Sequence, residues 1–87
     1  MLLKIRDNYI DLSHVRCITS ISVETIMGRM RMCFTLNVGG SEIRMGFKER
    51  KTAELVRTML AQASGGSHVY TSFLELQNQL ATIEENE

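Results

Sequence analysis

The stretch that most constrains the fold of this chain runs from Arg29 to Phe47. Polar and apolar residues alternate over 29–38, which is the period of a half-buried β-strand. Gly39-Gly40 then supplies a two-residue turn, and residues 41–47 run back. A slip of one residue would put the two apolar sets on opposite faces, so one register is predicted. Its pairs are Val38 with Ser41, Leu36 with Ile43, Phe34 with Met45, and Met32 with Phe47.

The N-terminal segment predicts a second hairpin. Residues 2–6 and 9–12 flank Asp7-Asn8, a pair that tolerates the positive φ of a tight turn. This turn would set Ile5 against Ile10 and Leu3 against Leu12. The inward residues are even-numbered here and odd-numbered from Val15 on, so we expect a bend near Ser13-His14.

Residues 15–24 predict one continuous strand that joins the central hairpin through a four-residue loop, Thr25–Gly28. One face of this strand would carry Val15, Cys17, Thr19, Ile21 and Val23. The corresponding pairs are Val23 with Met30, Ile21 with Met32, Thr19 with Phe34, and Cys17 with Leu36. Met30, Met32, Met45 and Met59 are then expected in the core, where methionine packs adaptably.

The apolar period changes from two to helical spacing after Phe47. Apolar residues then recur at Ala53, Val56, Met59, Leu60 and Ala63. A helix is therefore predicted from about Glu49 to Ser64, ended by Gly65-Gly66 and packed on the inward face of the sheet. Residues 1–64 would form a β-meander with its packing helix.

Residues 65–87 predict a Gly-Gly-Ser joint followed by an amphipathic helix. Ser72 and Glu75 match a capping box. The apolar positions of this helix are Val69, Phe73, Leu76, Leu80 and Ile83. Apolar residues at 4-3-4-3 spacing need a partner surface, so we expect this helix at a homodimer contact. The alternatives are docking back on the sheet of the same chain and binding a foreign partner.

The net charge is zero, but it is unevenly distributed. Residues 1–51 carry a net charge of +4 and residues 52–87 carry −4. This division indicates internal complementarity or solubility on one interpretation, and head-to-tail association or a basic binding face on the other. Two cysteines and no long apolar run indicate a reduced cytoplasmic setting without a membrane segment.

The outward face of the sheet is predicted to be small and nearly neutral, with a row formed by Ser20, Cys33 and Gly46. Small residues in a row permit close approach by a covering surface. Arginines surround this row: Arg16, Arg29, Arg31 and Arg44. These four could contact nucleic-acid phosphates, although the face has no aromatic residue on which a base could stack. Ile26 and Met27, at a loop tip, are candidate partner contacts.

Catalytic chemistry is not expected. His14 and Cys17 have the spacing of half a metal site, but no second pair follows. No carboxylate pair, activated nucleophile or phosphate loop can be assembled. We therefore expect no enzyme activity, metal, cofactor or small-molecule substrate.

The fold class predicted is α+β: a five-stranded, mainly antiparallel β-meander followed by two C-terminal α-helices. A β-meander followed by a helix resembles small bacterial and phage domains. The function expected is a non-catalytic protein-interaction module, homodimeric, acting as a small adaptor or a phage-type inhibitor of a larger assembly. The alternative is an RNA- or DNA-binding protein that uses the arginine-rimmed face.

Overall fold

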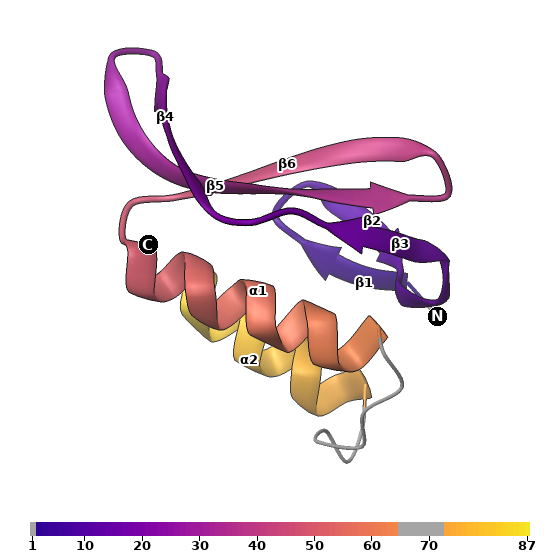
Figure 1. Ribbon diagram of the computed structural model, residues 1–87. Helices are drawn as coiled ribbons and strands as arrows, with labels where there is room; N and C mark the ends of the chain where they lie inside the picture. Colours follow the sequence, from indigo (N-terminus) through magenta and orange to yellow (C-terminus); the bar gives the residue numbers. More distant parts are fainter. Residues whose placement is uncertain (1, 65–72) are drawn as a thin grey trace.

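The computed structural model describes residues 2–64 and 73–87, without the side chain of Phe73 (Figure 1). The expected joint, Val69 and the capping residue Ser72 lie outside the described residues, as does the side chain of Phe73. The strands are β1 (Leu2–Ile5), β2 (Asn8–Asp11), β3 (Val15–Ile18), β4 (Ser22–Ile26), β5 (Arg29–Val38) and β6 (Ser41–Phe47). The helices are α1 (Arg50–Ser64) and α2 (Phe73–Glu85), and a short 3₁₀ helix spans Leu12–His14.

The α+β class and the antiparallel sheet followed by two helices are confirmed, although the described residues contain six strands instead of five. The segment predicted as one strand over 15–24 is divided into β3 and β4. The central strand β5 pairs with β6 along one side, while β3 and β4 pair with successive halves of its other side. β1 and β2 form a separate two-stranded sheet.

The central hairpin has the predicted register. All four expected pairs are present, from Val38 with Ser41 to Met32 with Phe47. Gly39 and Gly40 have φ of +58° and +95°, values that glycine adopts without the steric cost of a Cβ. Alternation and the two-residue turn therefore suffice to determine this element.

The predicted register of the first hairpin is wrong by two residues. Leu3 pairs with Ile10 and Ile5 with Asn8, so the turn is Arg6-Asp7. Because the error is two residues and side chains alternate, the apolar residues still face inward. The guanidinium carbon of Arg6 lies 4.6 Å from the centre of the Phe47 ring, a long-range contact that favours this turn.

The predicted bend at Ser13-His14 is confirmed as the 3₁₀ helix, but the following strand departs from the predicted pattern. Val15 lies opposite Val38, whereas Cys17 lies opposite Asn37, so a β-bulge reverses the alternation between them. Cys17, predicted inward, is consequently exposed, and Ile18 packs against the core.

The predicted loop between β4 and β5 is also wrong. The turn has two residues, Met27-Gly28, and Val23 pairs with Met32 instead of Met30. Val23 is 52% exposed and Met30 is 62% exposed, so neither lies in the predicted core. Both belong to the part of the sheet that continues past helix α1 (Figure 1).

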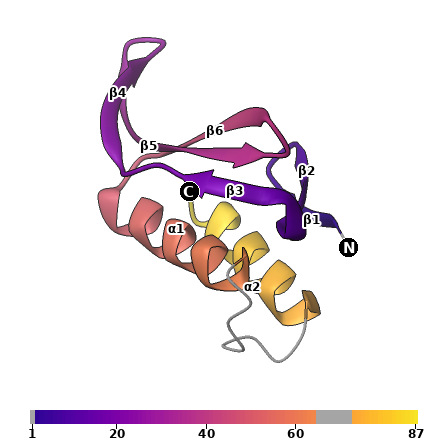
Figure 2. The same cartoon turned by 45° about the vertical axis from the view of Figure 1, so that its right-hand side comes forward.

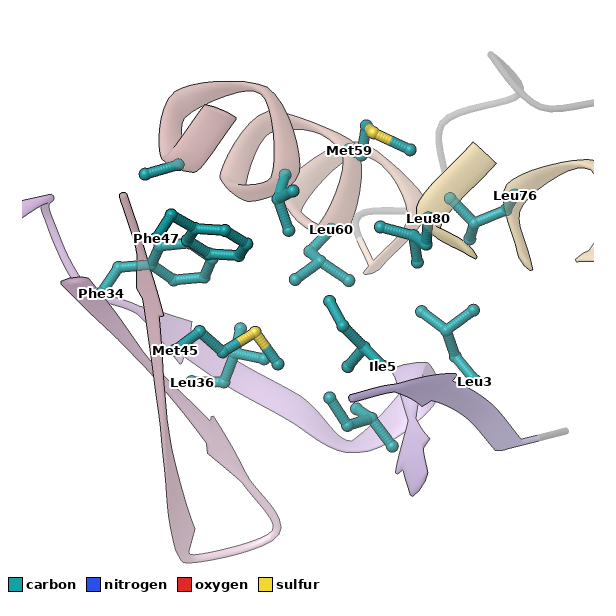
Figure 3. Close-up of a cluster of buried hydrophobic side chains, with 13 residues drawn as sticks. Leu3, Ile5, Phe34, Leu36, Met45, Phe47, Met59, Leu60, Leu76 and Leu80 are labelled. Atoms are coloured by element: carbon teal, nitrogen blue, oxygen red, sulfur yellow. The ribbon is translucent and has the colours of Figure 1, made fainter. Parts of the chain in front are cut away.

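Helices α1 and α2 lie on the same side of the four-stranded sheet (Figures 1 and 2). The α1 residues Ala53, Val56, Met59 and Leu60 are buried, as the helical spacing predicts. They pack with β-sheet side chains that include Phe34 and Phe47, whose ring centres are 6.0 Å apart (Figure 3). Neither helix of the described residues is long and apolar enough to cross a membrane.

Helix α2 docks on its own chain, against β1. Leu76 and Leu80 are 2% and 1% exposed and belong to the same core as Leu3 and Ile5 (Figure 3). Ile83 is partly buried against that core. The prediction that Leu76 and Leu80 form a dimer or partner contact is therefore wrong for these two residues, because the first hairpin and α1 leave a core that α2 completes. Homodimerisation of the chain stays a prediction.

Candidate functional site

The hairpin of β4 and the first part of β5, residues 22–33, projects from the rest of the molecule. We call this segment the β4–β5 arm. It curves away from the two helices (Figures 1 and 2), so neither α1 nor α2 covers the side that elsewhere faces the core. Its pairs run from Ser22 with Cys33 to Ile26 with Arg29. The arm thus presents apolar side chains to solvent at Val23, Met27 and Met30.

The tip of the arm is a strained turn. Met27 has φ of +52° and Gly28 has φ of +78°, which are the signs that a two-residue hairpin turn of type I′ requires. A left-handed conformation costs a residue with a Cβ about 1–2 kcal/mol, and asparagine or glycine usually occupies such a position. Met27 is also 97% exposed. A large apolar side chain is therefore held in water at a position that disfavours it.

The base of the arm is closely packed on its outer side. Cys33 is fully buried beside Gly46, where an added Cβ would lie 3.2 Å from Cys33 Sγ and 3.8 Å from Ile26 Cδ1. Burial, and then the charge of Glu24, raise the pKa of the Cys33 thiol. The small row was predicted with Ser20, but Ser22 takes that position. Ile26 Cδ1 reaches this row, and the side chain remains 36% exposed, so Ile26 is still available as the partner contact that the sequence predicts.

The four arginines do not form one basic cluster. Arg44 Nη1 lies 3.1 Å from Glu24 Oε1, and Arg31 Nη1 donates to the carbonyl of Met30. Arg29 begins β5, whereas Arg16 lies beside the bulge at its far end. A ten-residue strand separates these two ends by about 30 Å. The predicted nucleic-acid face is thus partly paired and divided between two ends of the sheet.

Three residues of the types found in catalytic triads lie together at the 3₁₀ helix: Asp11, Ser13 and His14. Ser13 Oγ donates to Asp11 Oδ1 at 2.6 Å, and His14 Nδ1 lies 2.9 Å from Asp11 Oδ2. A nucleophile and base would need the hydroxyl to contact a ring nitrogen while the carboxylate holds the other one. Here both contacts to the ring reach Nδ1, including that of Ser13 at 3.3 Å. The cluster is a cap of the 3₁₀ helix.

No group of three or more His, Cys, Asp or Glu side chains suited to a metal occurs within residues 2–64 and 73–87. Cys17 and His14 are both exposed, on either side of the start of β3. A surface depression lies near the end of β6 and has mixed charge. Its lining residues are Arg6, Arg31, Gly46, Lys48, Glu84 and Glu87. Its charged groups partly pair with each other, since Arg6 Nη2 lies 3.9 Å from Glu87 Oε1 and Lys48 Nζ donates to the main-chain oxygen of Glu87 at 2.7 Å.

The exposed apolar side of the arm was predicted only in part. The sequence identifies Met27 because a loop tip is recognisable from its residues. Alternation predicts Val23 and Met30 in the core, and the faces that it assigns to them are correct. What sequence alone did not reveal is that the sheet extends farther than the helix that covers it (Figure 1).

Comparisons of the chain with protein-family models, with curated proteins and with solved structures found no match.

Proposed function

We propose that this chain is a non-catalytic protein-interaction module, acting as a small adaptor or inhibitor, and that the β4–β5 arm is its contact. The observation that carries this proposal is Met27, which combines a φ of +52° with 97% exposure. Strain at a residue without a structural reason is a sign of function. Burial of one methionine side chain in a partner would supply about 1.5–3 kcal/mol, enough to offset the cost of the turn.

Arg6 provides an internal comparison for Met27. It is the other non-glycine residue with positive φ among the described residues, at +54°. Its side chain lies over the Phe47 ring, and its backbone N–H donates to Glu84 Oε1, so contacts within the chain offset its strain. No hydrogen bond, ion pair or ring contact of this kind holds Met27 within the described part of the chain. A contact with another molecule would fill that role.

Nucleic-acid binding through Arg16, Arg29, Arg31 and Arg44 is the alternative. It is less well supported, because Arg44 is paired with Glu24 and the exposed arginines Arg16 and Arg29 lie at opposite ends of β5. Binding to phosphates would also leave the exposed apolar tip of the arm without a role. The experiment below separates the two functions.

The test is the substitution Met27→Asn. Asparagine tolerates the left-handed turn, so the free energy of unfolding measured in urea should rise by about 1 kcal/mol. Immobilised wild-type and variant chains would then capture proteins from an extract of the source organism, compared by quantitative mass spectrometry. A specific partner should be retained about tenfold less by the variant or more weakly still, because the apolar contact is lost.

Leu74→Asn is the matched control. Leu74 is 66% exposed on α2, so this change also replaces an exposed apolar residue by asparagine but leaves the arm intact. The control should retain the same partner as the wild type. Equal retention by wild type and Met27→Asn would contradict the proposal. Salt-sensitive retention of nucleic acid in place of protein would favour the alternative.

A further inference from the structure

Side chains cover the backbone edges of several strands in this protein. At β1, the N–H of Lys4 donates to Gln77 Oε1 at 2.8 Å, and Gln77 Nε2 donates to the carbonyl of Lys4 at 2.6 Å. At the end of β3, Arg57 Nε donates to the carbonyl of Thr19 at 2.7 Å. A bulge also interrupts β3. Such features prevent an exposed edge from pairing with another chain.

The edge of β6 has similar protection. It carries the exposed charge of Glu42, and the N–H of Lys48, directly after the strand, donates to Glu87 Oε1 at 2.9 Å. Charged residues on an edge strand and a covering side chain both disfavour strand addition.

The edge of β4 lacks these features. The residues that flank a two-residue turn form a hydrogen-bonded pair, which here is Ile26 with Arg29. Hydrogen-bonded and non-hydrogen-bonded pairs alternate along an antiparallel ladder, so the backbone N–H and C=O groups of Ser22, Glu24 and Ile26 face β5. The N–H and C=O groups of Val23 and Thr25 consequently face away from β5. None of the hydrogen bonds within the described residues uses these groups. The strand has no proline or lysine, and its one charge, Glu24, is paired with Arg44 at 3.1 Å.

We infer that the β4 edges of two copies of this chain pair antiparallel, so that two arms form one four-stranded sheet. This inference rests on the proposed function, because it builds the contact surface of the arm from two copies. A second copy is favoured by self-complementarity. When Thr25 lies opposite Thr25 of the second copy, the new ladder spans Glu24, Thr25 and Ile26 of each copy. Val23 then lies beside Met27 at the turn of the other copy, so apolar side chains meet at each end of the ladder.

The charge of Glu24 disfavours one neighbouring register. Pairing centred one residue earlier would place the two Glu24 carboxylates directly opposite each other, and like charges at such positions are destabilising. Pairing centred on Thr25 places Glu24 opposite Ile26 of the second copy instead. The exposed apolar residues Val23 and Met30 of both copies then lie on one side of the new sheet, as a continuous surface.

The contact is small, because one strand of five residues supplies it. Interfaces of this size are weak, so the dissociation constant should lie in the micromolar to millimolar range. Sedimentation equilibrium of the wild type at up to about 1 mM should therefore show a reversible dimer. Hydrogen exchange of the Thr25 amide should slow as the protein concentration rises, because this N–H becomes bonded in the dimer.

Two variants test the edge. Thr25→Pro removes an N–H that does not pair with β5, and proline is tolerated at such edge positions. Val23→Lys keeps every backbone group but places a charge on the edge. Each should raise the dissociation constant at least about tenfold. Thr25→Val, which keeps the N–H and the β-branched shape, is the control and should dimerise like the wild type. Far-ultraviolet circular dichroism checks that each variant is folded.

The inference is overturned if the wild type remains a monomer throughout this concentration range. It is also overturned if a dimer persists unchanged in folded Val23→Lys or Thr25→Pro but is lost on Glu42→Lys, which would assign the contact to β6. A monomeric wild type whose foreign partner is still lost on Met27→Asn would refute the pairing of two copies and leave the proposed function standing. A β4-dependent dimer with equal capture by wild type and Met27→Asn would refute the proposed function instead.

Discussion

At the scale of single residues, Asp11 illustrates how a local cap shifts a titration. The hydroxyl of Ser13 donates to the carboxylate at 2.6 Å and the backbone N–H of Ser13 donates at 3.0 Å. These hydrogen bonds, followed by the contact with His14, lower the pKa of Asp11 from 3.8 to about 2. The cap therefore stabilises the charged form of Asp11 in the folded chain.

The pH dependence of stability follows from this shift. Because the folded pKa of about 2 lies below the unfolded value of 3.8, the contribution is complete above 3.8 and is lost as the pH falls through about 2. We expect the free energy of unfolding in urea to decrease over this interval, and Asp11→Asn to remove that part of the decrease. Ser13→Ala should raise the pKa of Asp11, as followed by the carboxyl chemical shift. An Asp11 that titrates near 3.8 in the folded protein would contradict this assignment.

At the scale of elements, the contact between α2 and β1 determines where the C-terminal helix lies. Gln77 uses both atoms of its amide to bond the N–H and C=O of Lys4, so a side chain takes the place of a neighbouring strand. Leu76 and Leu80, on the same helix, are buried beside β1 (Figure 3). Helical spacing predicts that these leucines need a partner surface, and this chain provides it.

Removal of the amide should weaken this docking. We expect Gln77→Ala to lower the free energy of unfolding by about 1 kcal/mol, which is the usual net value of such hydrogen bonds. Hydrogen exchange at the Lys4 amide should accelerate, because its N–H points to Gln77 and not to β2. Gln79→Ala is the control, since Gln79 is exposed and does not contact β1. Unchanged exchange at Lys4 in Gln77→Ala would rule out this docking.

At the scale of the whole molecule, the two oppositely charged parts of the sequence contact each other. Glu87, from the acidic part, accepts from the backbone N–H of Lys48, and Arg6 Nη2 lies 3.9 Å from Glu87 Oε1. These contacts favour internal complementarity as the explanation of the charge division. Helix α2 also supplies Leu76 and Leu80 to the core, so the C-terminal helix is part of one cooperative structure.

Two leucines on α2 test whether this helix unfolds together with the rest of the chain. Leu80 is 1% exposed, and Leu80→Ala should lower the free energy of unfolding by about 2–5 kcal/mol because it opens a cavity. Leu74 is 66% exposed, and Leu74→Ala should change the free energy of unfolding by less than about 0.5 kcal/mol. Chemical denaturation measures both. If Leu80→Ala instead left stability unchanged and abolished a dimer, α2 would be an intermolecular helix.

The sequence alone determined the elements that depend on neighbouring residues. The register from Met32 with Phe47 to Val38 with Ser41 follows from alternation and a glycine turn, and the buried face of α1 follows from helical spacing. The apolar tip at Met27 was also recognisable as a candidate contact. In each case the interactions responsible lie within a few residues along the chain or across one tight turn.

The tertiary structure decided the features that depend on distant contacts. The first turn moved to Arg6-Asp7, where Arg6 reaches Phe47 and Glu84. The bulge before Cys17 and the docking of α2 on β1 likewise have no local signal. Alternation shows which side chains share a face, but not how far a helix covers that face. The exposure of Val23 and Met30 therefore depends on the length and curvature of the sheet relative to α1, which only the folded chain defines.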